Sequence, residues 1–285
     1  MAFRLGSHTS PNCGEMIALN IRPEELLDVA TASAEEAGQK LLRLFRGSKR
    51  LSIRRKNDYP GSVVTNADIE SERIILGKIR RSRIKSTVNS EEAGTVNYGS
   101  REIIWALDPL DGTLNYVKRI PYFAVSIGVL QNGETVAGAI YNPVLDEMHT
   151  GCRGRGAHLN GKRIHVSNTE SLKNSALIFE WWDKEPLIPD PLELEKRLYR
   201  LTRSLRSPGS VALNLCSVAS GRFDGLVTVF RKSPIYETAA GCLILEEASG
   251  RVTNSSGESW KCFSDSILAG GPRIHGQLLS LVQRL

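Results

Sequence analysis

Residues 103–113 read Ile-Ile-Trp-Ala-Leu-Asp-Pro-Leu-Asp-Gly-Thr, an apolar run that ends in two carboxylates three positions apart. The apolar part predicts a buried β-strand, because β-branched and aromatic residues favour strands. Pro109 fixes its own φ and lacks an N–H, and Gly112 lets the backbone approach a ligand closely. A helix that begins at Thr113 would point free amides at the same place and favour an anion. The stretch can therefore supply cation ligands and a phosphate cradle together, with an Asx turn that caps a helix as the alternative.

The rest of the chain alternates between helix and strand patterns, which predicts a layered α and β fold. Helices are expected at 23–46, after Asp68, at 192–205, at 211–220 and at 239–248. Strands are expected at 122–130, 135–141 and 223–230, with tight turns at Asn132-Gly133 and Asn160-Gly161. The segment 182–191 holds three prolines and is expected to be a loop that leads to a C-terminal lobe.

Composition narrows the class of protein. The 285 residues are 41% hydrophobic and 24% charged, which is typical of globular proteins, and no stretch approaches the roughly 20 apolar residues of a membrane span. The five cysteines are scattered, which favours free thiols in a reducing cytoplasm. Residues 1–15 lack the apolar core of a signal peptide, and residues 1–17 are expected to be a disordered extension, with Met16 as an alternative start.

The net charge of +6 allows either a nucleic-acid surface or a solvated surface that attracts phosphate. Because no nucleic-acid motif accompanies the basic residues, the sequence predicts no nucleic-acid partner and no membrane partner.

Three further acids stand beside short or helix-starting segments: Asp68, Glu91 and Glu237. Oxygen ligands of this kind suit hard ions such as Mg²⁺, which favours phosphate oxygens. The five histidines are isolated and lack zinc-type spacing, so they are expected to be surface or hydrogen-bonded side chains.

These segments resemble the inositol monophosphatase family of magnesium-dependent, lithium-sensitive phosphatases, from about residue 18 to the end. The matching positions are an Asp at a helix start, an acidic pair, an Asp-Pro-hydrophobic-Asp-Gly-Thr motif and an acidic residue before Ala-Ala-Gly: Asp68, Glu91, Asp108, Leu110, Asp111, Gly112, Thr113 and Glu237. Three positions depart from the family pattern. Ser90 replaces a glycine, Glu237 replaces a metal-site aspartate, and Thr228 stands where animal members place a glutamate that holds inositol hydroxyls.

The resemblance implies a role for each matching residue. Glu91, Asp108 and the Leu110 carbonyl would hold one Mg²⁺, and Asp108, Asp111 and Glu237 a second, with a third ion near Glu91. Asp68, Thr113 and Glu91 would be catalytic, by orienting and deprotonating a water. The amides of Gly112 and Thr113 would bind phosphate, and the substrate would be lined by Gly209, Ser210, Val211 and Arg231, although Arg231 and Lys232 could equally be a surface pair.

The implied activity is hydrolysis of small sugar or polyol phosphates, fructose 1,6-bisphosphate or inositol 1-phosphate, of the archaeal dual-activity type. Hydrolysis of 3′-phosphoadenosine phosphates or NADP, and a catalytically weak binding homologue, remain alternatives. The implied fold is an alternating α-β-α-β-α sandwich in a homodimer. An N-terminal lobe of residues 18–185 would carry the metal site, and a C-terminal lobe of residues 186–285 would line the substrate.

Overall fold

The computed structural model describes residues 21–47, 51–55, 63–181, 191–229, 234–261 and 264–284. The expected N-terminal extension, the segment 182–190, Arg231 and Lys232 lie outside these residues.

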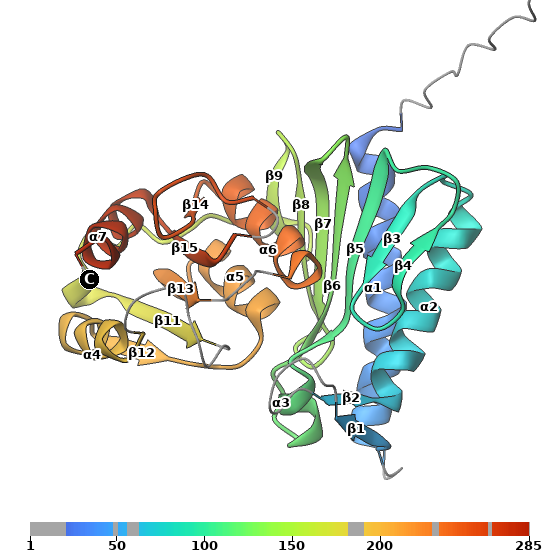
Figure 1. Cartoon of the computed structure of the whole chain (residues 1–285), viewed down its shortest axis with the longest axis horizontal. Coiled ribbons are helices and arrows are strands. Elements are labelled where there is room, and N and C mark those ends of the chain that lie inside the picture. Colours follow the sequence, from blue (N-terminus) through green and yellow to red (C-terminus); the bar gives the residue numbers. More distant parts are fainter. Residues whose placement is uncertain are drawn as a thin grey trace, which may run out of the picture.

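Five layers of helices and sheets alternate across the molecule (Figure 1). Helices α1 (Pro23–Arg46) and α2 (Asn66–Ser82) cover the outer face of an eight-stranded sheet. Helices α5 (Val211–Ala219) and α6 (Ile235–Glu247) lie between that sheet and a five-stranded sheet. Helices α4 (Pro191–Leu201) and α7 (Pro272–Val282) form the last layer. This order confirms the α-β-α-β-α sandwich that the resemblance implied.

The eight-stranded sheet carries the stretch that opened the sequence analysis. Its strands lie in the order β10 (Lys162–Arg163), β9 (Gly156–Leu159), β8 (Glu147–Cys152), β7 (Glu134–Asn142), β6 (Ala124–Gln131), β5 (Ile103–Asp111), β3 (Thr87–Ser90) and β4 (Gly94–Asn97). Only the β3–β5 pair among them is parallel. Helix α3 (Thr113–Val117) follows β5, and a two-stranded sheet of β1 (Ile53–Arg55) and β2 (Val63–Thr65) lies nearby.

The five-stranded sheet has the order β12 (Ser204–Arg206), β11 (Ala176–Trp181), β13 (Gly225–Val229), β15 (Ser266–Gly270) and β14 (Arg251–Thr253). A 3₁₀ turn, η1 (Leu172–Asn174), precedes β11. Because β11 belongs to this sheet, the chain enters the second sheet before residue 186. The division into lobes at that residue stays a proposal.

Several element boundaries differ from the sequence expectations. The helix expected at 192–205 is α4, which begins at Pro191 and ends at Leu201, because residues 204–206 pair with β11 as strand β12. Helix α2 begins at Asn66, two residues before Asp68, where Thr65 caps its N-terminus. Strand β5 runs on through the acidic motif to Asp111. The tight turns at Asn132-Gly133 and Asn160-Gly161 are confirmed, since all four residues have positive φ.

One histidine contradicts the expectation of surface or hydrogen-bonded side chains. His149 on β8 is buried, and neither ring nitrogen has a hydrogen-bond partner. Burial lowers its pKa to about 4, against a smaller opposing effect of Glu147, so the ring is neutral near pH 7. His275 fits the expectation, because its Nε2 lies 2.9 Å from the Thr253 hydroxyl.

Two glycines set how closely α6 lies on the large sheet. Gly128 on β6 and Gly138 on β7 are direct neighbours in the sheet. A Cβ on Gly128 would lie 2.9 Å from Ala239 Cβ and 3.0 Å from the Ala240 nitrogen, so the alanine pair of α6 rests directly on the glycine pair. Helix α6 carries Glu237 in its first turn. The contact with the glycine pair therefore fixes how far the backbone at Glu237 lies from the large sheet.

Among the described residues, none of the helices has the length and apolar character that crossing a membrane would need.

We expect Gly128→Ala to lower the free energy of unfolding by about 1–3 kcal/mol, because the added methyl overpacks the contact between β6 and α6. Gly276→Ala is the matched control: its Cβ would meet nothing within 4 Å on helix α7, and alanine should stabilise a helix by about 0.5–1 kcal/mol. Urea unfolding of both variants measures the difference. Equal stabilities would show that α6 does not depend on a close contact with the sheet.

Candidate metal and phosphate site

The carboxyl end of β5 places two acids in the interior. The pairing of β5 with β6 shifts register between Asp108 and Asp111, so the backbone bulges within the acidic motif. Asp108 Oδ1 accepts a hydrogen bond of 2.9 Å from the Leu110 N–H, which is the Asx turn considered from the sequence. The turn does not cap α3, because the N-cap residue is Gly112 and no side chain caps it. The positive φ of Gly112, and the 2.9 Å from its missing Cβ to the Tyr122 oxygen, require glycine there.

The acids of the motif lie among other negative charges. Asp108 and Asp111 are 2% and 5% exposed. Burial raises the pKa of Asp108 well above its usual range, and the charges of Glu91, Asp111 and Glu237 raise it further. Burial also raises the pKa of Asp111, against hydrogen bonds from Ser210 and Ala212. Four of the five acids that the sequence nominated, Glu91, Asp108, Asp111 and Glu237, therefore lie near enough for their charges to act on one another, which favours a cation.

Glu237 reaches this cluster because α6 begins beside β5. Ser126 on β6 pairs directly with Asp108, and its hydroxyl lies 3.3 Å from the Tyr236 carbonyl oxygen. Tyr236 precedes Glu237 in the first turn of α6. The sheet therefore holds the start of α6 next to Asp108, which explains the effect of the Glu237 charge on the Asp108 pKa.

Asp68 and Thr113 also meet. Asp68 Oδ2 accepts hydrogen bonds of 2.8 Å from the Thr65 N–H and 2.6 Å from the Thr65 hydroxyl. Its Oδ1 lies 3.2 Å from the Thr113 hydroxyl, which is also 2.9 Å from the Leu110 carbonyl oxygen. Burial raises the pKa of Asp68 to about 6, although the Thr65 hydrogen bonds lower it. A carboxyl group that titrates near neutral pH and touches a hydroxyl has the character of a general base.

The turn that carries Glu91 is held by an acid that the sequence reasoning missed. Glu72 on α2 is buried, and its Oε1 accepts hydrogen bonds from the Ser90 hydroxyl and, at 2.9 Å, from the Ala93 N–H. Ser90, which departs from the family glycine, therefore gains a partner for its hydroxyl. Glu72 lies four residues after Asp68, on the same face of the helix, and this spacing was the available signal.

A turn at Pro208–Ser210 brings the C-terminal half of the chain to the acids. The Ser210 hydroxyl donates to Asp111 Oδ2, and the Ala212 N–H donates to the same oxygen at 3.0 Å. Asn115 on α3 donates to the Pro208 carbonyl oxygen at 2.8 Å and to the Tyr122 carbonyl oxygen at 2.9 Å. Of the expected substrate residues, Ser210 therefore contacts Asp111 directly, and Gly209 and Val211 flank it in the chain.

Two further buried residues lie behind this turn. Glu180, at the end of β11, accepts a hydrogen bond from the Gly209 N–H. Burial raises the pKa of Glu180, while that hydrogen bond and the neighbouring amide of Asn214 lower it. Thr228 is fully buried on β13, directly beside Glu180, and its hydroxyl has no hydrogen-bond partner. No sequence motif marked Asn115 or Glu180, because both act through contacts between distant segments.

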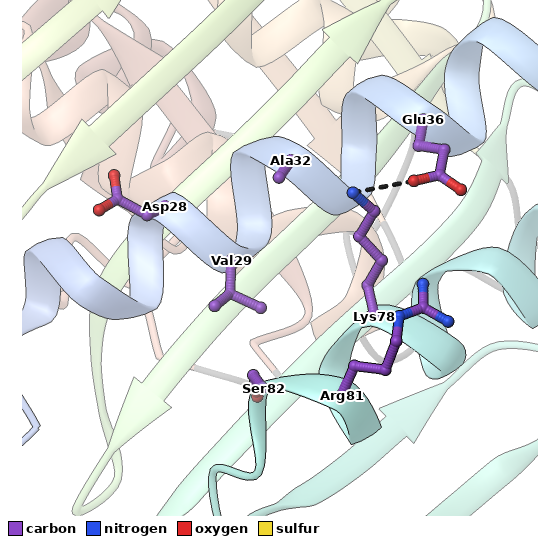
Figure 2. Close-up of a pocket in the computed structure, with 7 residues that line it drawn as sticks. All are labelled: Asp28, Val29, Ala32, Glu36, Lys78, Arg81 and Ser82. Carbon is purple, nitrogen blue, oxygen red and sulfur yellow. Dashed lines mark ion pairs between the residues drawn. The ribbon is translucent and has the colours of Figure 1, made fainter.

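A groove between the two outer helices is a separate feature. Figure 2 shows its lining residues on α1 and α2, which are Asp28, Val29, Ala32, Glu36, Lys78, Arg81 and Ser82. Lys78 pairs with Glu36 at 2.8 Å across it. None of the lining residues belongs to the acid cluster, so the groove is not the candidate site.

We expect Asn115→Ala to lower the free energy of unfolding by about 1–3 kcal/mol, because it removes the donor from partly buried carbonyl oxygens of two segments. The control is Thr95→Ala, which loses one exposed side-chain hydrogen bond of 3.1 Å to Asn89 and should change stability by less than about 0.5 kcal/mol. Urea unfolding measures both variants. A loss for Asn115→Ala no larger than for the control would contradict its bridging role.

Comparison with known proteins agrees with this arrangement. Nus factor SuhB from Pasteurella multocida (strain Pm70) is 35% identical over 261 residues, which are 90% of this chain and 96% of that protein. Fructose-1,6-bisphosphatase/inositol-1-monophosphatase from Aquifex aeolicus (strain VF5) is 35% identical over 262 residues, 92% of this chain and 96% of that protein. The solved structure of inositol monophosphatase from Anabaena (Nostoc) sp. PCC 7120 has a TM-score of 0.80 at 34% identity, covering 92% of this chain and 96% of that one.

The model of the inositol monophosphatase family matches residues 22–285, nearly all of the described chain and the whole acid cluster. The chain therefore belongs to the inositol monophosphatase family.

Proposed function

We propose that this protein is a magnesium-dependent phosphomonoesterase that hydrolyses small sugar or polyol phosphates. The observation that carries the proposal is the cluster of buried carboxylates at the end of β5, whose charges raise the pKa of Asp108. Buried acids that repel one another need a cation to be charged together. A hydroxyl and a carboxyl group of raised pKa stand directly beside them, which adds a base to the site.

The donors fit magnesium in their chemistry. Glu91, Asp108 and the Leu110 carbonyl would hold one ion, and Asp108, Asp111 and Glu237 a second, while a third ion would share Glu91. All are oxygen donors, as magnesium prefers. Among the described residues, no three acid, histidine or cysteine side chains already stand close enough to hold an ion, so we expect side chains to rotate on binding. When bound, magnesium supplies charge for the phosphate oxygens and a lower pKa for water.

The chain itself supplies the proton acceptor and the phosphate cradle. Thr113 Oγ1 would orient the attacking water, with Glu91 beside it, and Asp68 Oδ1 would take up the proton through the Thr113 hydroxyl. An Asp68 pKa near 6 leaves this oxygen charged, and able to accept a proton, at neutral pH. The amides of Gly112 and Thr113 would hold the phosphate. No side chain needs to form a covalent phospho-intermediate.

The substrate is the finer part of the proposal. Gly209, Ser210 and Val211 would line the polyol side, with Arg231 meeting a second phosphate. The family resemblance puts Thr228 where animal members have a carboxylate that holds inositol hydroxyls, and the lack of that carboxylate would weaken a preference for inositol. A sugar bisphosphate brings a second dianion, which suits a guanidinium group. Lithium sensitivity, a homodimer and a cytoplasmic location stay predictions from the family resemblance.

We expect Asp111→Asn to lower kcat at least about a hundredfold, because it removes one charge from the centre of the cluster while keeping the shape of the side chain. Phosphate release from a sugar phosphate, with and without added magnesium, measures the effect. Asp146→Asn is the control, since this residue accepts a hydrogen bond from Tyr141 and takes no part in the cluster. Near wild-type turnover of Asp111→Asn would remove this residue from the mechanism.

We also expect kcat/KM for fructose 1,6-bisphosphate to equal or exceed that for inositol 1-phosphate. Arg231→Ala should reduce kcat/KM for the bisphosphate more than for the monophosphate, because a lost hydrogen bond to a charged group costs about 1.5–3 kcal/mol. A panel that includes both compounds, 3′-phosphoadenosine 5′-phosphate and NADP also tests the other substrates of the family. Strong preference for inositol 1-phosphate would leave only the general phosphatase proposal.

A second candidate is a non-catalytic role. The relative named Nus factor SuhB is as similar to this chain, at 35% identity, as the relative named for its phosphatase activity. Such a role would rest on a surface that binds a partner, and the net charge of +6 makes an acidic partner the natural choice. Complementation of a bacterium that lacks its own SuhB separates the two. If Asp111→Asn complements as well as the wild type, the non-catalytic role is favoured; if it fails although folded, catalysis is required.

A further inference from the structure

A buried carboxylate outside the acid cluster connects the two sheets. Glu180 is the next-to-last residue of β11 in the five-stranded sheet and is 2% exposed. A carboxylate at such depth is costly unless it makes hydrogen bonds. The metal, phosphate and substrate roles proposed above leave Glu180 without a part, so its position calls for a separate explanation.

The partner of Glu180 is the backbone of the turn that faces the acids. Glu180 Oε1 accepts a hydrogen bond of 2.5 Å from the Gly209 N–H. Gly209 has a φ of +85°, a conformation that few other residues adopt without strain. Asn115 on α3 donates to the carbonyl side of the same turn, at 2.8 Å from the Pro208 oxygen. The turn is therefore held on one side by the large sheet's α3 and on the other by the small sheet's β11.

The Pro208–Ser210 turn also holds Asp111. Ser210, the residue after Gly209, donates its hydroxyl to Asp111 Oδ2, and the Ala212 N–H donates to the same oxygen. A shift of the Gly209 backbone would move the Ser210 hydroxyl with it. We propose that Glu180 is a positioning residue that fixes the Gly209–Ser210 backbone and thereby orients Asp111 for the site, an inference that rests on the proposed function.

The second oxygen of Glu180 allows a sharp test. Glu180 Oε2 is buried without a hydrogen bond of ordinary geometry, and the neighbouring side chain that lowers the Glu180 pKa is the amide of Asn214. A glutamine at 180 keeps an oxygen acceptor for the Gly209 N–H but carries no charge. Positioning needs only the acceptor, whereas direct binding of substrate or transfer of a proton by Glu180 needs the carboxylate. Glu180→Gln therefore separates the two roles.

The experiment compares Glu180→Ala, Glu180→Gln and Leu177→Ala in the full chain. Leu177 is buried on the same strand but lies in a different core cluster from the turn, so its truncation controls for general loss of stability. Amide hydrogen exchange of peptides within residues 207–214, without magnesium or substrate, reports on the turn directly. The magnesium concentration for half-maximal phosphate release, kcat and KM report on the site.

For Glu180→Ala we expect amide exchange in 207–214 to become about 10- to 100-fold faster, the equivalent of a lost hydrogen bond to a charged group. We expect kcat to fall about 10- to 100-fold, with a higher magnesium requirement, as for a site group displaced by about 1 Å. Glu180→Gln should restore both properties to within about threefold of the wild type. Leu177→Ala should lower the melting temperature without changing either.

Unchanged exchange in Glu180→Ala would overturn the inference. So would a Glu180→Gln variant whose exchange is normal but whose kcat falls as in Glu180→Ala, since the carboxylate would then act directly. If the wild type releases no phosphate from any compound of the panel, the proposed function fails while the exchange measurement still decides whether Glu180 holds the turn.

Discussion

The repulsion among buried carboxylates is the constraint on which the rest of this structure depends. Asp108 lies in the interior among the charges of Glu91, Asp111 and Glu237, an arrangement that opposes folding. The fold offsets part of this cost with donors aimed at single oxygens. Asp111 receives the Ser210 hydroxyl and the Ala212 N–H, and Asp108 receives the Leu110 N–H. The repulsion among the carboxylates that these donors leave uncompensated would be relieved by a bound cation, and this relief would contribute to the cation's binding free energy.

The layered architecture places the hydrogen-bond donors to Asp111 in a different layer from the acid itself. Strand β5 supplies the acids, but the donors to Asp111 come from the start of α5, in the middle layer. That layer must therefore lie tightly on the large sheet while remaining anchored to the small one. The Gly128–Gly138 pair permits the first contact, and Glu180, reaching Gly209, provides an anchor on the second. A site divided between two sheets thus needs a helical layer between them.

Features of the fold that depend on neighbouring residues in the chain could be predicted from the sequence. Features that depend on contacts between distant segments could not. Helix α1 and the tight turns depend on neighbours in the chain, and were predicted correctly. The acids were nominated by family motifs. Helix α4 ends early because a neighbouring strand captures residues 204–206, which no local pattern reveals. Asn115 and Glu180 escaped notice since their partners lie 93 and 29 residues away.

Position 237 has a glutamate where the family pattern has an aspartate, and the contacts that fix helix α6 limit how the longer side chain can fit. The start of α6 is fixed by the Ser126 hydroxyl at the Tyr236 carbonyl, and its depth by the glycine pair of the sheet. A glutamate in place of aspartate therefore cannot be accommodated by sliding the helix, and the extra methylene must be absorbed by the side-chain rotamer. An acid in the first turn of a helix is favoured by the helix dipole in either case. The substitution thus changes the reach of one carboxylate while the backbone platform that positions it stays the same.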